Sequence, residues 1–209
     1  MPEVDIPAAA RTIRPDKCVP LLTGVSEGWL GADTPTARDE LRRAGFVVTS
    51  VTAGLTANSR HKVTLDVVCR DERIAARPWH TLVQLLGLAA ARRELGIGVH
   101  SGWGPQAENH VRYDHATKRF VRLTVPDGVW DEFGHDGLVR SWILEYAHGG
   151  FERRRLREKI VRYGPNPQLW VTPSHAHSAV VVELLSETFP AVLHRVVTVD
   201  WTGGAYGTA

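Results

Sequence analysis

The sequence of 209 residues predicts a mixed α/β fold in two parts. Three observations lead to this expectation. A helical segment near residues 34–46 is followed by two β-rich runs, an amphipathic helical pattern begins near residue 80, and strand-like runs alternate with helical patterns from residue 118 onward. Apolar residues recur with a period of 3.6 in helices and of 2 in strands. The later alternation therefore predicts parallel strands connected by helices.

The first part, residues 1–75, is expected to hold a helix and a β-hairpin. Residues 1–17 contain few large apolar side chains, so a loose arm is expected there. In TPTARDELRRAGF, Thr34 or Thr36 is the candidate N-cap and Gly45 the stop. The runs FVVTSVT and HKVTLDVV, joined by AGLTANSR, predict the hairpin. A helix followed by a hairpin forms the second half of a winged helix-turn-helix, so a winged-helix-like domain is expected.

The charges of that first predicted helix cancel. Three basic residues stand against three acidic ones: Arg38, Arg42 and Arg43 against Asp33, Asp39 and Glu40. A helix that reads DNA usually presents a basic face. The balance therefore favours a structural role for this helix.

The second part, residues 76–209, follows a polar stretch, CRDERIAARP, that is the candidate boundary. HTLVQLLGLAAARRELG predicts an amphipathic helix with Leu82, Leu85 and Leu86 on one stripe and Gly96 as its stop. The remaining elements are expected as strands at 118–130 and 137–147 with a turn at 131–137, a helix at 151–163, a strand at 168–173, a helix at 174–189, a strand at 194–201 and a frayed tail.

Bulk composition gives little sign of a charged partner. The net charge is +2 and the pI about 8.7, so attraction to phosphate must come from local clustering. Cys18 and Cys69 lack metal or redox spacing, which favours two free thiols in a reducing cytosol over the alternative of a disulfide. No signal peptide or membrane-spanning run is recognisable, so a soluble cytoplasmic protein is expected.

Two carboxylates and a lysine form the candidate catalytic site. Asp127 lies in VPDG where a strand meets a turn, Glu145 ends the next strand, and Lys159 lies in the helix that follows. Carboxylates on adjacent strands can hold one divalent cation, Mg²⁺ or Mn²⁺, through oxygen ligands. Such a cation activates water and neutralises charge on phosphorus. Two simpler readings stay open, because Pro-Asp-Gly is a common turn sequence and Glu145 could pair with a helix arginine.

The helix beyond Glu145 is strongly basic. Its cationic residues, besides Lys159, are Arg153, Arg154, Arg155, Arg157 and Arg162. Guanidinium groups suit phosphate oxygens. These five arginines are the candidate DNA-binding residues.

Five segments in this order carry a family resemblance: RPWHTLVQLLGLAAARRELG, VPDGVW, ILEYAHGG, RLREKIVRY and LWVTPS. They resemble the replication-relaxation family of plasmids and mobile elements, within the PD-(D/E)xK restriction-endonuclease-like superfamily. The resemblance covers roughly residues 76–200. It implies a restriction-endonuclease-like core behind a winged-helix-like domain, with Asp127, Glu145 and Lys159 in catalytic positions. The superfamily places its lysine two residues beyond the acid, where this chain has Ala147.

The resemblance implies a DNA-binding protein of plasmid or mobile-element replication or transfer that nicks or cleaves DNA with Mg²⁺ or Mn²⁺, like a relaxase or endonuclease. Two alternatives remain: a catalytically silent DNA binder, and an adaptor in a replication or transfer complex. The partners would be DNA and such proteins, with a homodimer possible and the oligomeric state open.

Four further residues near the site have weaker roles. Glu108 is a candidate extra acidic ligand and His148 a candidate acid–base group. Tyr146 should face the side of its strand opposite Glu145. Tyr163 is expected either to pack or to contact phosphate.

Overall fold

The computed structural model describes residues 3–54, 62–98, 101–106, 111–114, 118–122, 125–134, 137–147 and 152–199. The first elements are α1 (Ile6–Asp16), β1 (Cys18–Pro20), α2 (Leu21–Ser26), α3 (Pro35–Arg43), β2 (Val47–Gly54), β3 (Lys62–Cys69), α4 (Glu72–Ala75) and α5 (Trp79–Glu94). The later ones are β4 (Gly104–Pro105), β5 (Val111–Asp114), β6 (Arg119–Arg122), β7 (Gly128–Phe133), β8 (Val139–Tyr146), α6 (Arg153–Tyr163), β9 (Gln168–Thr172), α7 (His175–Thr188) and β10 (His194–Thr198).

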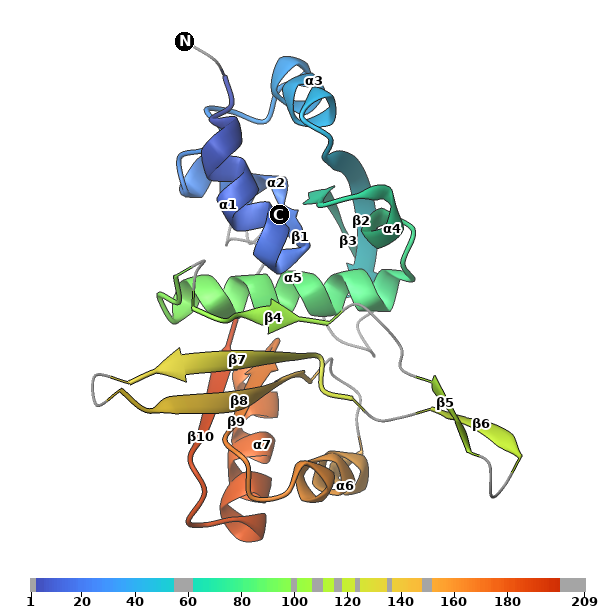
Figure 1. Ribbon diagram of the computed structural model, residues 1–209, viewed down its shortest axis with the longest axis vertical. Coiled ribbons are helices and arrows are strands. Elements are labelled where there is room, and N and C mark those ends of the chain that lie inside the picture. The colour runs from blue at the N-terminus through green and yellow to red at the C-terminus, as the bar shows by residue number, and fades with distance from the viewer. Residues whose placement is uncertain are drawn as a thin grey trace.

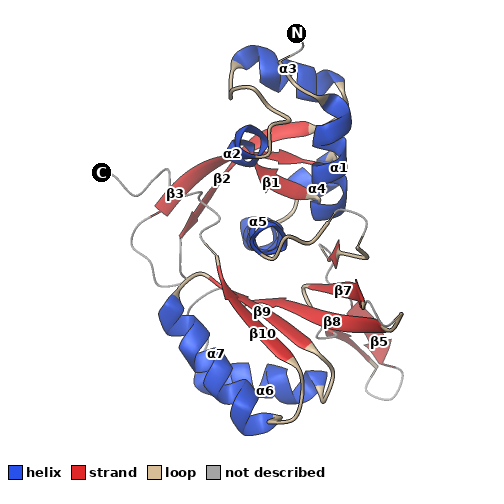
Figure 2. Cartoon of the chain, turned by 90° about the vertical axis from the view of Figure 1, so that its left-hand side faces the viewer, coloured by secondary structure: helices blue, strands red, loops and turns tan. Residues whose placement is uncertain are grey.

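These elements form a mixed α/β fold in layers, as Figures 1 and 2 show. A three-stranded antiparallel sheet, β1-β3-β2, lies on one side of α5, and a five-stranded sheet, β10-β9-β8-β7-β4, lies on the other. Helices α6 and α7 cover the far face of the larger sheet. Strands β8, β9 and β10 are parallel, which confirms the expectation for the later strands.

Helix α5 is buried on nearly all of its circumference. Its buried residues are Thr81, Leu82, Val83, Leu85, Leu86, Gly87, Leu88, Ala89, Ala90, Ala91 and Arg92. One apolar cluster joins its side chains to Val67 of β3 on one side and Leu144 of β8 on the other. The expected single stripe of leucines is therefore one part of a helix that is apolar all round, as buried helices are. The boundary expected between residues 75 and 76 lies just before α5.

The loose arm expected at residues 1–17 is wrong, because most of it forms α1. Asp5 caps this helix by accepting a hydrogen bond from the Ala8 amide at 3.0 Å. Ala9 and Ile13 are fully buried. Small side chains let α1 approach its neighbours closely, so the shortage of large apolar residues did not indicate disorder.

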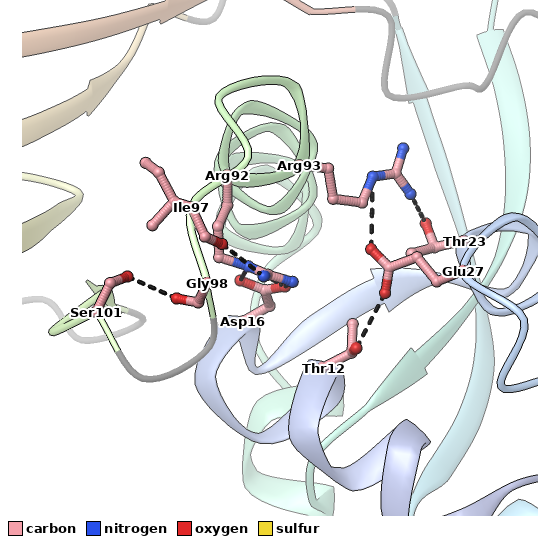
Figure 3. A network of polar contacts seen from close by, with 9 residues as sticks. All are labelled: Thr12, Asp16, Thr23, Glu27, Arg92, Arg93, Ile97, Gly98 and Ser101. Carbon is pink, nitrogen blue, oxygen red and sulfur yellow. Dashed lines mark hydrogen bonds and ion pairs between the residues drawn. The ribbon is translucent and has the colours of Figure 1, made fainter.

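A buried ion pair joins the end of α1 to the end of α5 (Figure 3). Arg92 donates from Nε to Asp16 Oδ1 at 2.9 Å and from Nη2 to Oδ2 at 2.8 Å. Its Nη1 donates to the Ile97 carbonyl at 3.1 Å. Burial raises the pKa of Asp16, and the hydrogen bond and charge of Arg92 oppose that rise. Beside this pair, Arg93 contacts Glu27 and Thr23 on α2 and its C-terminal end.

The strand boundaries differ from expectation in one region. The run expected at 118–130 divides into β6 and β7, and β7 continues through Phe133 into the segment expected as a turn. The reversal instead uses Gly134 and Gly137, the latter with φ +76°, a value that glycine adopts readily. Most of the expected loop AGLTANSR and the C-terminal tail lie outside the described residues.

Cys18 and Cys69 are free, buried and directly opposite each other on β1 and β3. Their sulfur atoms are 3.1 Å apart. Among the helices of the described ranges, none combines the length and apolar character needed to cross a bilayer.

The ion pair gives a first prediction. We expect Arg92→Met to lower the free energy of unfolding by about 3–5 kcal/mol, because Asp16 is then buried without its partner. The double variant Asp16→Leu/Arg92→Met should lose clearly less, since it buries no uncompensated charge. Urea denaturation at neutral pH measures both, and a double variant less stable than the single one would contradict the expectation.

Gly87 gives a second prediction. A Cβ at this position would lie 2.3 Å from Tyr146 Cε2, and the Tyr146 ring is only 1% exposed and cannot move aside. Gly87→Ala should therefore lower the free energy of unfolding by about 1–3 kcal/mol. Gly98→Ala is the matched control, because a Cβ there meets no atom within 4 Å. Equal stability of the two variants would show that α5 and β8 do not pack as described.

Candidate metal and phosphate site

The hairpin register brings the two candidate acids together. Asp127 directly precedes β7, and Glu145 is the second-last residue of β8. The strands are antiparallel with Gly128 opposite Leu144, so the start of one lies beside the end of the other. The two acids, 18 positions apart in sequence, are thus brought to a single corner of the sheet.

Glu145 is buried, at 1% exposed, and both of its oxygens accept hydrogen bonds from α6. Lys159 Nζ donates to Oε1, and the Tyr163 hydroxyl donates to Oε2 at 2.5 Å. Tyr146 lies on the opposite face of β8 within the apolar cluster around α5, as expected from the alternation of side chains along a strand. Glu145 therefore points toward α6, where two donors offset the free energy that burying its charge would cost.

Asp127 is half-buried and lies close enough to Glu145 for the two carboxylates to influence each other. Its Oδ2 accepts a hydrogen bond from the Tyr146 backbone amide at 2.8 Å. Burial raises the pKa of Asp127 well above its usual range, and the negative charge of Glu145 raises it further, while the charge of Lys159 acts in the opposite direction. The same surroundings, burial first and then the charge of Glu145, raise the pKa of the Tyr163 hydroxyl.

The site thus holds two carboxylates against one ammonium group. An oxygen donor set that is short of positive charge fits a hard divalent cation such as Mg²⁺ or Mn²⁺. Within the described parts of the chain, no cluster of three or more His, Cys, Asp or Glu side chains is grouped for a metal. Water and phosphate oxygens would have to complete the coordination shell. Glu108 and His148, the two weaker candidates, lie outside the described residues.

Ala147 occupies the position where the superfamily that the sequence resembles carries its lysine. It is 2% exposed and packs in the apolar cluster that contains Leu156 and Ile160 of α6. A lysine ammonium at this buried position would have to replace those apolar contacts. The ammonium beside Glu145 comes instead from Lys159, one residue before Ile160 on the same helix.

Most arginines of α6 are paired with carboxylates of this chain. Arg153 contacts Glu183 on α7 at 2.7 Å, and Arg157 contacts Glu187 on the same helix. Arg153 also contacts Glu187 at 3.2 Å, and a further pair lies within α6, between Arg154 and Glu158 at 2.9 Å.

Arg155 and Arg162 are also exposed. Arg155 makes no ion pair within the described ranges. The packing of α7 against α6 therefore neutralises much of the charge that the sequence of α6 alone suggests.

Sequence reasoning missed two features of the site. Tyr163 packs in an apolar cluster, which confirms one of its two expected roles, but its hydrogen bond to Glu145 was not expected. The signal was present, because Lys159 and Tyr163 are four residues apart and so lie on one face of a helix. The pairing of Glu183 and Glu187 with α6 depends on how α6 and α7 pack, which no local pattern indicates.

No protein-family model, curated protein or solved structure matches this chain. The resemblance to the replication-relaxation family therefore rests on the residues and on the order of the motifs. The geometry of the site carries the functional argument.

The raised pKa of Asp127 gives a third prediction. A carboxyl group whose pKa is higher in the folded than in the unfolded chain holds its proton more tightly when folded, so its ionisation lowers stability as the pH rises through the folded value. Asp127→Asn should therefore raise the free energy of unfolding at pH 7.5, because the amide cannot ionise, and this gain should disappear toward pH 4. Urea denaturation across that range measures the difference.

Glu94→Gln, at an exposed position of α5, is the surface control for this experiment. It should show no comparable gain. A less stable Asp127→Asn at pH 7.5 would contradict the assignment of Asp127 to a buried site with excess negative charge.

Proposed function

We propose that this chain is a DNA-binding protein of plasmid or mobile-element replication or transfer that nicks or cleaves DNA with Mg²⁺ or Mn²⁺. One observation carries the proposal: Asp127 and Glu145, distant in sequence, lie together at one corner of the sheet with Lys159 hydrogen-bonded to Glu145. Its cellular place would be the reducing cytoplasm, with replication or transfer proteins as further partners.

In this proposal Asp127 and Glu145 would hold the cation, which would supply Lewis-acid chemistry for water activation and for charge on phosphorus. The Tyr146 amide fixes one oxygen of Asp127, and the Tyr163 hydroxyl fixes one oxygen of Glu145. The Lys159 ammonium offsets one negative charge among the two acids. It is also the group placed to stabilise an anionic phosphate oxygen near Glu145.

The order of elements supports the restriction-endonuclease-like and winged-helix-like parts of the proposal. The β7–β8 hairpin carries one acid at its start and the other at its end. Helix α6 and the parallel strand β9 follow it. In the first part, α1, β1, α2, α3 and the β2–β3 pair follow one another, and β1 pairs with β3. A small helical unit with a terminal hairpin is the arrangement of a winged helix.

A catalytically silent DNA binder is the second candidate. Lys159 and Tyr163 already engage both oxygens of Glu145, and a buried alanine stands two residues beyond that acid. In that case the ion pair between Lys159 and Glu145 would have a structural role, stabilising the contact between α6 and β8.

Cleavage of supercoiled plasmid in Mg²⁺ or Mn²⁺ tests the proposal. Wild-type protein should convert the plasmid to open circles or linear DNA, and Glu145→Gln should lose at least about 100-fold in rate, because the cation loses an anionic ligand. Glu158→Gln is the matched control, since Glu158 lies on the exposed side of α6 and pairs only with Arg154 among the described ion pairs. It should cleave at the wild-type rate.

Two outcomes would redirect this assignment. Equal cleavage by wild type and Glu145→Gln would place the chemistry elsewhere or in a contaminant. No cleavage by wild type, with plasmid DNA still shifted in a binding gel, would favour the silent binder.

A further inference from the structure

The three-stranded sheet brings the two cysteines of this chain together. Cys18 begins β1 and Cys69 ends β3, and the antiparallel register pairs them although they are 51 positions apart in sequence. Their Sγ atoms are 3.1 Å apart, and the Cys69 thiol donates a hydrogen bond to the sulfur of Cys18. Neither thiol belongs to the carboxylate site, so their close approach calls for an account of its own.

The backbone places this pair where two strands approach most closely. The Arg70 amide donates to the Lys17 carbonyl at 2.7 Å, so the next pair of residues, Cys18 and Cys69, is a non-hydrogen-bonded pair of the ladder. Cα atoms in such pairs are about 4.5 Å apart, which lies within the range of about 4.4–6.8 Å that disulfides span. The sulfur atoms would have to approach by only about 1 Å to reach the length of a disulfide bond.

Burial protects both thiols while the strands are paired. Cys18 and Cys69 are 0% exposed and lie in the apolar cluster around α5. The hydrogen bond from Cys69 and burial raise the pKa of the Cys18 thiol, and the thiolate is the form that reacts. Strand β1 has only three residues and lies at an edge of its sheet, so its separation from β3 is the opening that exposes the sulfur atoms.

We propose that Cys18 and Cys69 are a redox pair that forms a reversible disulfide between β1 and β3 under oxidising conditions. Both thiols are free in this structure, which is therefore the reduced state of the pair. The oxidant is a small-molecule disulfide, for which glutathione disulfide serves as the probe. The proposal does not depend on the DNA-directed function.

The reaction is thiol–disulfide exchange in two steps. The thiolate of one cysteine attacks a sulfur atom of the oxidant, breaks its S–S bond and forms a mixed disulfide, while the released thiolate takes up a proton. The second cysteine then loses its proton, attacks the protein sulfur of the mixed disulfide and expels the second small thiol. Overall the two cysteines give up two protons and two electrons, and the oxidant becomes two thiols.

The new bond would close residues 18–69 into a covalent ring. Strand β3 is the central strand of its sheet, and Cys69 also lies opposite Val47 of β2. The bond would thus fasten the short edge strand β1 to the strand that pairs with both of its neighbours. Because a cross-link restricts the unfolded chain, the oxidised protein should be more stable than the reduced protein and should open less readily at β1.

The test refolds the full chain from urea in mixtures of reduced and oxidised glutathione, so that burial does not keep the oxidant from the thiols. The products are alkylated in denaturant and weighed by intact mass spectrometry. Since the chain contains only two cysteines, a monomer that carries neither alkyl groups nor glutathione must contain the bond between Cys18 and Cys69. Thermal denaturation then compares the Tm of the oxidised and the reduced protein.

The matched control, Cys69→Ala/Val68→Cys, keeps two cysteines but moves one of them to the neighbouring position of β3. The side chain of Val68 lies in a different apolar cluster, on the opposite face of the strand from Cys69. The sulfur at position 68 should therefore point away from Cys18. Cys69→Ala is the second control, because it removes one thiol and adds no other change.

Wild type should give the linked monomer, with a Tm about 5–15 °C above that of the reduced protein, and dithiothreitol should restore the lower value. Neither control should show this rise on oxidation. The inference would be overturned by wild type that keeps two free thiols or ends only as glutathione adducts or linked dimers. It would equally be overturned by a linked monomer with an unchanged or lower Tm, or by the same rise in Cys69→Ala/Val68→Cys.

Discussion

Helix α5 carries apolar side chains on every side, and all of them have to be buried away from water. The two sheets therefore pack on opposite sides of this helix. Each fully buried leucine contributes about 1.5–3 kcal/mol, and Leu82 to Leu88 include four of them, which neither sheet alone could cover. The contact of Gly87 with Tyr146 then fixes which face of β8 meets the helix. Because side chains alternate along a strand, Glu145 must face α6. The position of the candidate site thus follows from the packing of a helix on the opposite side of the sheet.

Glu145 illustrates how a carboxylate is retained within a packed interior. A buried carboxylate is unfavourable without donors, and this one receives two from a single helical face. The negative charge of Asp127 beside it is less well compensated by hydrogen-bond donors and cationic groups. Such a local excess of like charge is common where a site binds a cation or works on an anion, because the protein gives up some stability for function.

Local sequence patterns predicted the helices and strands of this chain better than they predicted which side chains of different elements contact one another. The helix near residue 80 and the parallel strands were evident from the spacing of their apolar residues, and the basic helix from its run of cationic residues. Helix α1 was missed because alanines bury well without a strong apolar pattern. The acids and Lys159 were recognisable by chemistry, and Tyr163 lies on the same helical face as Lys159 by its spacing of four residues, whereas the pairing of Glu183 and Glu187 with α6 depends on how the two helices pack. Sequence spacing has no information on that packing.

Helix α5 packs against both sheets, and this affects how the protein unfolds. Each side of α5 packs against a different sheet. If either sheet opens, the helix exposes a long apolar surface, and the state with the other sheet still folded becomes less favourable. The buried bond between Asp16 and Arg92 ties the first helix into the same unit. The two sheets should therefore melt in one cooperative transition, with matching hydrogen-exchange protection in β3 and β8 despite their separation in sequence.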